Sequence, residues 1–221
     1  MNNTQIFQTE REFIEAVVGE IHSRILNKTR KGEIFRLALS GGSTPGPIYR
    51  KLAEQDVPWG QVEIYLVDER YVPLDHEHSN YRMIREAMLD HVKPRKVVYF
   101  DTSLSIEECL KKYESQLDSS QDQFFDLILL GIGIDGHTAS LFPNSPALEE
   151  KKRWVSHTTT DQFNIRDRFT LTFPALESSH ERFVLLKGRG KKESLQKLHL
   201  EKLPASVVRG MKNTEIFLLD Q

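Results

Sequence analysis

The chain has 221 residues, and its 30 Lys and Arg nearly balance its 32 Asp and Glu, which leaves a formal net charge of −2. This balance gives no reason to expect a nucleic acid or an anionic membrane as a partner, and the apolar runs are too short and interrupted to cross a bilayer. The N-terminus lacks the basic and apolar segments of a secretory signal. The single cysteine, Cys109, excludes an intrachain disulfide, and we expect a cytoplasmic protein.

Helical patterns and apolar runs alternate along the chain. Thr9 and Glu12 form a predicted capping box, and Ser79 and Ser105 cap two further predicted helices. In chain order we predict a helix from residue 9, strand 34–39, helix 47–54, strand 62–67, helix 79–91, strand 97–100, a helix from residue 105, strands 125–130, 168–173 and 182–186, helix 194–200 and strand 216–219. This alternation predicts one α/β domain over residues 1–221, with an open, mostly parallel sheet and helices on both faces.

The first polar loop after a predicted strand is rich in glycine. Residues 40–46 read SGGSTPG and lie directly before a helix. Glycines let backbone N–H groups approach a ligand, the helix N-terminus favours anions, and hydroxyl groups add donors. We therefore expect Gly41, Gly42, Ser43 and Thr44 to bind a phosphate or sugar phosphate, the alternative being a plain strand-to-helix turn. The motif is neither a P-loop nor GxGxxG, so it does not indicate a nucleotide.

Three charged residues, Asp68, Glu69 and Arg70, follow the next predicted strand. Three charged side chains at the end of an apolar strand are hard to explain as part of a hydrophobic core. Arg70 could hold a phosphate through a bidentate contact, and Asp68 could accept protons or hydroxyl hydrogen bonds. The alternative is a solvated turn with a local ion pair.

The third loop, residues 131–140, reads GIGIDGHTAS. Asp135 and His137 flank Gly136, and we predict that His137 begins a short helix through residues 138–142. The positive end of a helix favours neutral imidazole, which can act as a general base near pH 7. A helix-capping histidine with a structural aspartate is the alternative. We favour catalysis because all three loops fall at the carboxyl ends of strands, where they can converge.

Other polar residues give weaker signals. Arg168 opens a strand and Lys191 opens a helix, and each is a further candidate for contact with an anion. The run Asp-His-Glu-His at residues 75–78 resembles a metal cluster but lies in a loop without a placed third ligand, so we predict no metal site. Cys109 lies inside a predicted helix, where we expect an inert buried thiol.

Five motifs, in this order, resemble those of the 6-phosphogluconolactonases. They are LALSGGSTP, LVDERYVP followed by Ser79-Asn80-Tyr81, LLGIGIDGHTASLFP, RFTLTFPAL and LLKGRGKK, and they span about residues 34–192. The resemblance implies a Rossmann-like fold, hydrolysis of 6-phospho-D-glucono-1,5-lactone in the oxidative pentose phosphate pathway, and no metal or organic cofactor. The related glucosamine-6-phosphate deaminases resemble GxDGHIAFNEP in the third loop, with a glutamate that assists ring opening. In this chain Leu141, Phe142 and Pro143 stand in that stretch, and no acid follows until Glu149.

The loops and the resemblance together give an expected site. Gly41–Thr44 and Arg70, with contributions from Arg168 and Lys191, hold the 6-phosphate, and His137 activates water for attack on C1. Asp135 or Asp68 orients His137 or binds sugar hydroxyls, while N–H groups of the third loop stabilise the oxyanion. The alternative functions are a glucosamine-6-phosphate deaminase, a sugar-phosphate isomerase or a non-catalytic sugar-phosphate sensor. As partners we expect a small sugar-phosphate lactone, no nucleic acid and no membrane, with the chain a monomer or weak homo-oligomer.

Overall fold

The computed structural model describes residues 3–189 and 203–221, and its centre is a seven-stranded sheet. The strand order is β1-β10-β9-β6-β2-β3-β5, and each of these pairings is parallel. The strands are β1 (Thr4–Phe7), β2 (Phe35–Leu39), β3 (Val62–Leu66), β5 (Lys96–Val98), β6 (Phe125–Leu130), β9 (Ser179–Lys187) and β10 (Thr214–Leu219). The predicted α/β architecture, an open and mostly parallel sheet, is confirmed.

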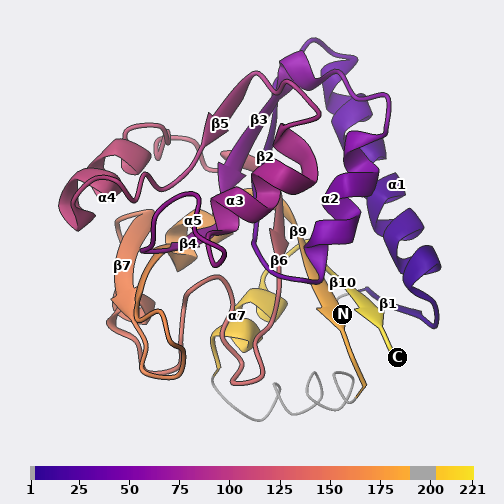
Figure 1. The fold of residues 1–221 in the computed structure, drawn as a ribbon. Helices are drawn as coiled ribbons and strands as arrows, with labels where there is room; N and C mark the ends of the chain where they lie inside the picture. The colour runs from indigo at the N-terminus through magenta and orange to yellow at the C-terminus, as the bar shows by residue number, and fades with distance from the viewer. Residues whose placement is uncertain (1–2, 190–202) are drawn as a thin grey trace.

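Helices cover both faces of this sheet, as Figure 1 shows. One face carries the helices α1 (Glu10–Thr29), α2 (Pro45–Ala53) and α3 (Asn80–Ile84). A π-helical turn at Arg85–Leu89 continues α3. The helices α4 (Ile106–Glu114), α5 (Phe173–Glu177) and α7 (Pro204–Gly210) lie on the other face. Successive side chains of β2 therefore enter different cores: Leu37 and Leu39 pack with α1 and α2, and Ala38 packs on the opposite side.

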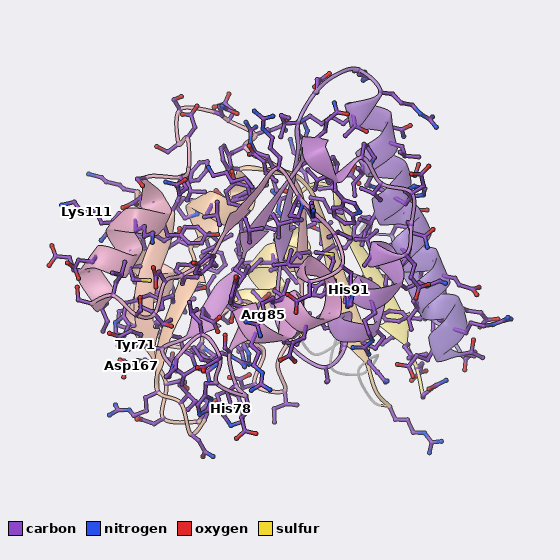
Figure 2. The ribbon with its side chains drawn as sticks, turned by 45° about the horizontal axis from the view of Figure 1, so that its top comes forward. Tyr71, His78, Arg85, His91, Lys111 and Asp167 are labelled. Carbon is purple, nitrogen blue, oxygen red and sulfur yellow. The ribbon has the colours of Figure 1, made fainter. Side chains whose placement is uncertain are left out.

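A second, three-stranded antiparallel sheet has the order β4-β8-β7. It contains β4 (Asp68–Arg70), β7 (Val155–Thr159) and β8 (Asp167–Leu171). The predicted strand 168–173 is thus β8, but it lies outside the parallel sheet and ends at Leu171, because α5 begins at Phe173 with Pro174 in its first turn. At the junction of β4 and β8, the N–H of Tyr71 donates to the carbonyl of Asp167 at 2.9 Å (Figure 2).

The helix caps agree with the sequence in part. Ser105 forms the predicted capping box with Glu108, and Ser79 accepts a hydrogen bond from the N–H of Arg82 at 3.1 Å. The hydroxyl of Thr9 caps α1 by accepting from the N–H of Glu12 at 3.3 Å, but the Glu12 carboxylate bonds the Thr9 hydroxyl in place of its N–H. The strands β1, β4 and β7 are absent from the prediction, since each is short and has exposed or charged residues. The predicted helix 194–200 lies outside the described residues.

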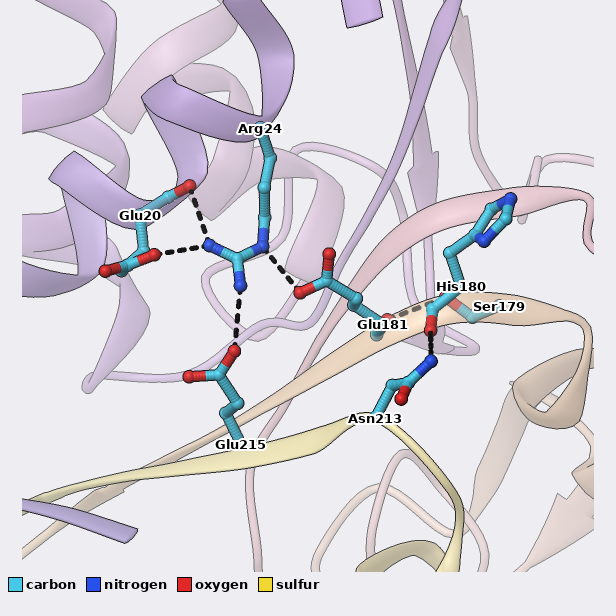
Figure 3. Close-up of polar contacts among 7 residues, drawn as sticks. All are labelled: Glu20, Arg24, Ser179, His180, Glu181, Asn213 and Glu215. Carbon is cyan, nitrogen blue, oxygen red and sulfur yellow. Dashed lines mark hydrogen bonds and ion pairs between the residues drawn. The ribbon is translucent and has the colours of Figure 1, made fainter. Parts of the chain in front are cut away.

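Ion pairs connect α1 to the amino ends of two strands of the sheet. The Nε and Nη2 atoms of Arg24 on α1 donate to Glu181 at the start of β9, at 2.6 Å, and to Glu215 at the start of β10, at 2.8 Å, while Glu20 binds the same guanidinium (Figure 3). These contacts dock α1 against two strands. The other end of the sheet is the one that carries the polar loops. Across residues 3–189 and 203–221, no helix has the length and apolarity needed to cross a bilayer.

Candidate active site

A cleft of about 290 Å³ opens at the carboxyl ends of β2, β6 and β9. From β2 the chain proceeds to β3 and β5 on one side, while β6, β9 and β10 lie on the other, so the strand order reverses between β2 and β6. Loops that leave neighbouring strands in opposite directions create a crevice at such a point, where open α/β sheets bind ligands. The predicted site residues that line the cleft are Gly41, Gly42, Ser43, Thr44, Asp68, Arg70 and His137.

The glycine-rich first loop offers uncommitted donors to the cleft. Gly42 has φ +114°, a conformation that favours glycine, and in the described part of the chain the N–H groups of Gly42 and Ser43 have no backbone acceptor. Thr44 is the N-cap of α2, yet its hydroxyl makes no cap bond. Backbone and hydroxyl donors at a helix N-terminus form a setting that suits an anion.

The residues Asp68, Glu69 and Arg70, predicted as a loop, form the strand β4, and Glu69 has a structural role there. Its side chain is fully buried, and its two oxygens accept four hydrogen bonds, from the N–H groups of Arg70, Asn80 and Tyr81 and from the Ser79 hydroxyl, at 2.7 to 3.1 Å. Burial raises the pKa of Glu69, while these N–H donors oppose the shift. The carboxylate therefore satisfies the first free N–H groups of α3 and holds that helix beside the cleft.

Arg70 carries an unsatisfied donor at the cleft. Its Nη1 donates to the carbonyl of His78 at 2.8 Å, but its buried Nε has no hydrogen-bond partner. Arg168 faces Arg70 across the β4–β8 pair, is 6% exposed, and donates from Nε to the carbonyl of Ile165 at 2.9 Å. Burial first, and then the charge of Arg70, lower the pKa of Arg168. Arg168 pairs with Arg70 in the β4–β8 register but is not among the residues that line the cleft.

In the third loop, Asp135 is the aspartate that contacts His137. Its Oδ1 lies 2.5 Å from the Nδ1 of His137, whereas Asp68 bonds other residues. A Cβ at Gly133 would lie 2.2 Å from the imidazole atoms Cε1 and Nδ1, so only glycine leaves room for this pair. The buried Oδ2 of Asp135 has no partner. When Nδ1 carries the hydrogen of this bond, Nε2 is left to accept a proton.

The predicted helix over residues 138–142 is wrong. The segment is a tight turn, with a bridge between Thr138 and Leu141 and with Ala139 at φ +52°, a conformation that a right-handed helix excludes. The hydroxyl of Thr138 donates to the carbonyl of Gly131 at 2.9 Å and closes the loop on itself. No helix dipole therefore acts on His137 from this segment, and its environment is set by Asp135 and by the rings of Phe142 and Phe163, whose centroids lie 4.7 and 5.7 Å from the imidazole.

Two N–H groups expected to stabilise an oxyanion are already bonded inside the third loop. The N–H of Gly133 donates to the carbonyl of His137 at 2.9 Å, and that of Gly136 donates to the carbonyl of Gly133 at 3.2 Å. Gly136 has φ +80°, and its carbonyl accepts the N–H of Ala205 at 3.0 Å, so α7 also anchors the loop. These two hydrogen bonds fix the backbone around Asp135 and His137. Among the described residues, the N–H groups of Gly42 and Ser43 in the first loop are without a backbone acceptor.

Sequence reasoning missed three polar residues at the site. Asn80 lines the cleft and Ser140 lies behind it, and both bond Asp68; Lys187 lines the cleft from the end of β9 and pairs with Glu10 at 2.7 Å. Asn80 stands in one of the motifs of the resemblance, but its position after Ser79 indicates only a helix start. The predicted Lys191 lies outside the described residues.

Two other sequence predictions concern metals and the thiol. Cys109 is buried in α4, and burial raises its pKa to about 12, which confirms an inert thiol. The rings of His76 and His78 are tilted by 48° to each other, with centroids 5.3 Å apart. Among the residues that the structure describes, no group of three or more His, Cys, Asp or Glu side chains is placed to hold a metal ion.

Comparison with known proteins assigns this arrangement to a family. Residues 8–217 match the family model described as glucosamine-6-phosphate isomerases/6-phosphogluconolactonase. The chain is 38% identical over 221 residues to 6-phosphogluconolactonase of Thermotoga maritima, covering 99% of both chains, and 36% identical to that of Synechocystis, covering 94% of this chain and 91% of the relative. The crystal structure of the Thermotoga maritima protein superposes with a TM-score of 0.89 at 36% identity over all of both chains. The three-dimensional structure of 6-phosphogluconolactonase from Trypanosoma brucei superposes with a TM-score of 0.87 at 28% identity. The match covers 100% of this chain and 96% of that chain. The chain belongs to the glucosamine-6-phosphate isomerase/6-phosphogluconolactonase family, and within it to the 6-phosphogluconolactonases.

Proposed function

We propose that this chain hydrolyses 6-phospho-D-glucono-1,5-lactone to 6-phospho-D-gluconate, the second step of the oxidative pentose phosphate pathway. One observation carries the proposal: the same cleft presents His137, backed by Asp135, and a set of uncommitted donors in the first loop and on Arg70. A base at one side of a small cleft and an anion site at the other suit a phosphorylated ester. The family and its named relatives support the same reaction.

The 6-phosphate is bound by Arg70 and the first loop. The guanidinium of Arg70, the N–H groups of Gly42 and Ser43, and the hydroxyls of Ser43 and Thr44 supply donors for its oxygens. Arg168, which pairs with Arg70 in the β4–β8 register, adds positive potential, and Lys191 adds a further cation. Because the lactone has little apolar surface to bury, this anchoring supplies most of its orientation.

His137 acts as the general base. Its Nε2 accepts a proton from a water molecule as the water oxygen forms a bond with C1, and Asp135 stabilises the resulting imidazolium through Nδ1. The tetrahedral intermediate then breaks the bond between C1 and the ring oxygen, and the imidazolium returns its proton to that oxygen. The product is an open-chain acid that loses its proton to solvent. General-base catalysis of this kind contributes about 10²–10⁴-fold.

Asp68 binds the sugar hydroxyls. It lies on the cleft wall, and its carboxylate contacts Asn80 and Ser140 without touching His137. An ionised carboxylate accepts hydrogen bonds only, so it suits ring hydroxyls as donors. The alternative assignment, Asp68 as the partner of His137, does not fit these contacts.

The test is a hydrolysis assay with lactone generated freshly by glucose-6-phosphate dehydrogenase, because the lactone also opens spontaneously. Wild type should accelerate its loss in the presence of EDTA, and His137→Ala should lose about 10²-fold or more of kcat. His180→Ala is the matched control, since His180 is exposed and lies at the start of β9, whereas the cleft lies at the other end of this strand. Figure 3 shows His180 beside Glu181. If His137→Ala turned over the lactone at the wild-type rate, His137 would be excluded as the general base. Ammonia release from glucosamine 6-phosphate would indicate a deaminase, and binding without turnover would indicate a sensor.

We also infer how the protein works in the cell. A single domain acts in the cytoplasm, as a monomer or weak homo-oligomer, without nucleic acid or membrane. The two hydrophobic cores lie on opposite faces of one sheet, which supports a single domain. A buried free thiol suits a reducing compartment.

A further inference from the structure

The carboxylate of Asp68 links the start of α3 to the third loop at the wall of the cleft. Asp68 is 7% exposed and begins β4, which only Val67 separates from the end of β3. Its Oδ1 accepts from the Nδ2 of Asn80 at 3.1 Å, and its Oδ2 accepts from the Oγ of Ser140, in the third loop, at 2.8 Å. Both of these donors are neutral groups, an amide and a hydroxyl, and together they fix the orientation of the Asp68 carboxylate.

Asn80 is itself fixed on three sides. It is 2% exposed, its N–H donates to Glu69 at 2.7 Å, and its Nδ2 donates both to the Asp68 carboxylate and to the Asp68 carbonyl, the latter at 2.9 Å. The Asn80 side chain packs directly against Gly41. A Cβ at position 41 would lie only 1.9 Å from the Oδ1 of Asn80. Gly41 therefore admits the carboxamide that holds Asp68.

Ser140 is fixed from the other side. It is 1% exposed, follows the left-handed residue Ala139, and its N–H donates to the hydroxyl of Thr170 on β8 at 3.1 Å. The Thr170 hydroxyl in turn donates to the carbonyl of Leu171 at 2.8 Å. Ser140 thus presents its hydroxyl to Asp68 from a rigid turn and not from a mobile side chain.

We propose that Asn80 and Ser140 are positioning residues of the lactone site, which hold the Asp68 carboxylate so that its remaining lone pairs accept hydrogen bonds from the sugar ring. This inference rests on the proposed function. A carboxylate has about four acceptor positions, and the two side-chain donors leave the others directed at the ligand. Since Asp68 does not contact His137, the two residues act on substrate binding and not on proton transfer.

The experiment is a double-mutant cycle with the full-length protein and the lactone assay. Ser140→Ala should lower kcat/KM by about 10- to 100-fold, mainly through KM, because a hydrogen bond to a charged group is lost. In the Asp68→Asn background the same change should cost less than about threefold, since the charge that Ser140 orients is gone. Asn80→Ala supplies an independent second test. Ser178→Ala is the control, because its buried hydroxyl bonds the Ala175 carbonyl at 2.8 Å, at the far end of the sheet.

Melting temperatures separate positioning from folding. Ser140→Ala could lower kcat/KM equally in the wild-type and Asp68→Asn backgrounds and also lower the melting temperature. This result would show that Ser140 has only a structural role and would overturn the inference. Unchanged KM in both Ser140→Ala and Asn80→Ala would overturn it as well. Wild-type protein without lactonase activity would refute the proposed function itself, whereas an active wild type with unaffected variants would refute only the positioning role.

Discussion

The tight packing of Gly133 against Asp135 and His137, the proposed catalytic pair, predicts that Gly133→Ala lowers kcat strongly without unfolding the protein. A Cβ at this position would lie 2.2 Å from Cε1 and Nδ1 of His137 and 2.6 Å from Oδ1 of Asp135. Non-bonded carbon contacts need about 3.5 Å, so the imidazole must move by roughly 1 Å. A misplacement of that size costs about 10²-fold in rate. Gly133 does not have a positive φ, so the backbone itself accepts alanine.

The assay compares kcat and the melting temperature of wild type, Gly133→Ala and Gly19→Ala. Gly133→Ala should lose about 10²-fold in kcat, while overpacking costs about 1–3 kcal/mol of stability. Gly19 lies within α1, where a Cβ would meet nothing within 4 Å. Gly19→Ala should therefore keep wild-type kinetics and gain roughly 0.5–1 kcal/mol. A Gly133→Ala enzyme with wild-type kcat would show that the Asp135–His137 geometry does not limit the reaction.

Four further predictions follow from particular contacts. Gly41→Ala should displace the Asn80 side chain, which lies 1.9 Å from the added Cβ, and should lower kcat/KM about tenfold or more; unchanged kinetics would refute the role of this glycine. Arg70→Ala should raise KM for the phosphorylated lactone about 10- to 100-fold and leave hydrolysis of unphosphorylated glucono-1,5-lactone unaffected, so an equal effect on both substrates would argue against phosphate binding. Ser105→Ala removes a capping box and should cost about 1 kcal/mol, or about 2–4 °C in melting temperature, with kinetics unchanged. Because burial raises the pKa of Cys109 to about 12, the native thiol stays protonated at pH 9 and should resist alkylation until the protein unfolds; rapid labelling of native protein would contradict this.

Much of the site could be predicted because its signals are local. Apolar runs such as residues 125–130 indicate strands covered on both faces, and glycines or charges directly after them mark the carboxyl ends where ligands bind. Residues of the first loop, Arg70 and His137, which the sequence patterns single out, line one cleft in the structure, and their roles there stay a prediction.

Contacts between distant residues could not be predicted in this way. The pairing of β4 with β8 turns a charged segment into a strand, and it explains why Glu69 is a buried helix cap while Asp68 faces the cleft. The turn after His137 resembles a helix in sequence, but the left-handed Ala139 and the bond from Ser140 to Thr170 fix another conformation. Hydrogen bonds to a neighbouring strand outweigh a weak local helix preference.

The amino-acid sequence by itself determined the class of sheet, most of its parallel strands and the loops that follow them, since hydrophobic periodicity and turn residues act over a few positions. Only the tertiary structure decided which aspartate serves His137. Asp135 and Asp68 both follow strands that end at the cleft, but Gly133 leaves room for Asp135 beside the imidazole, while Asn80 and Ser140 hold Asp68 away from it. Carboxylates are assigned by the donors that surround them, and those donors come from segments far apart in the chain.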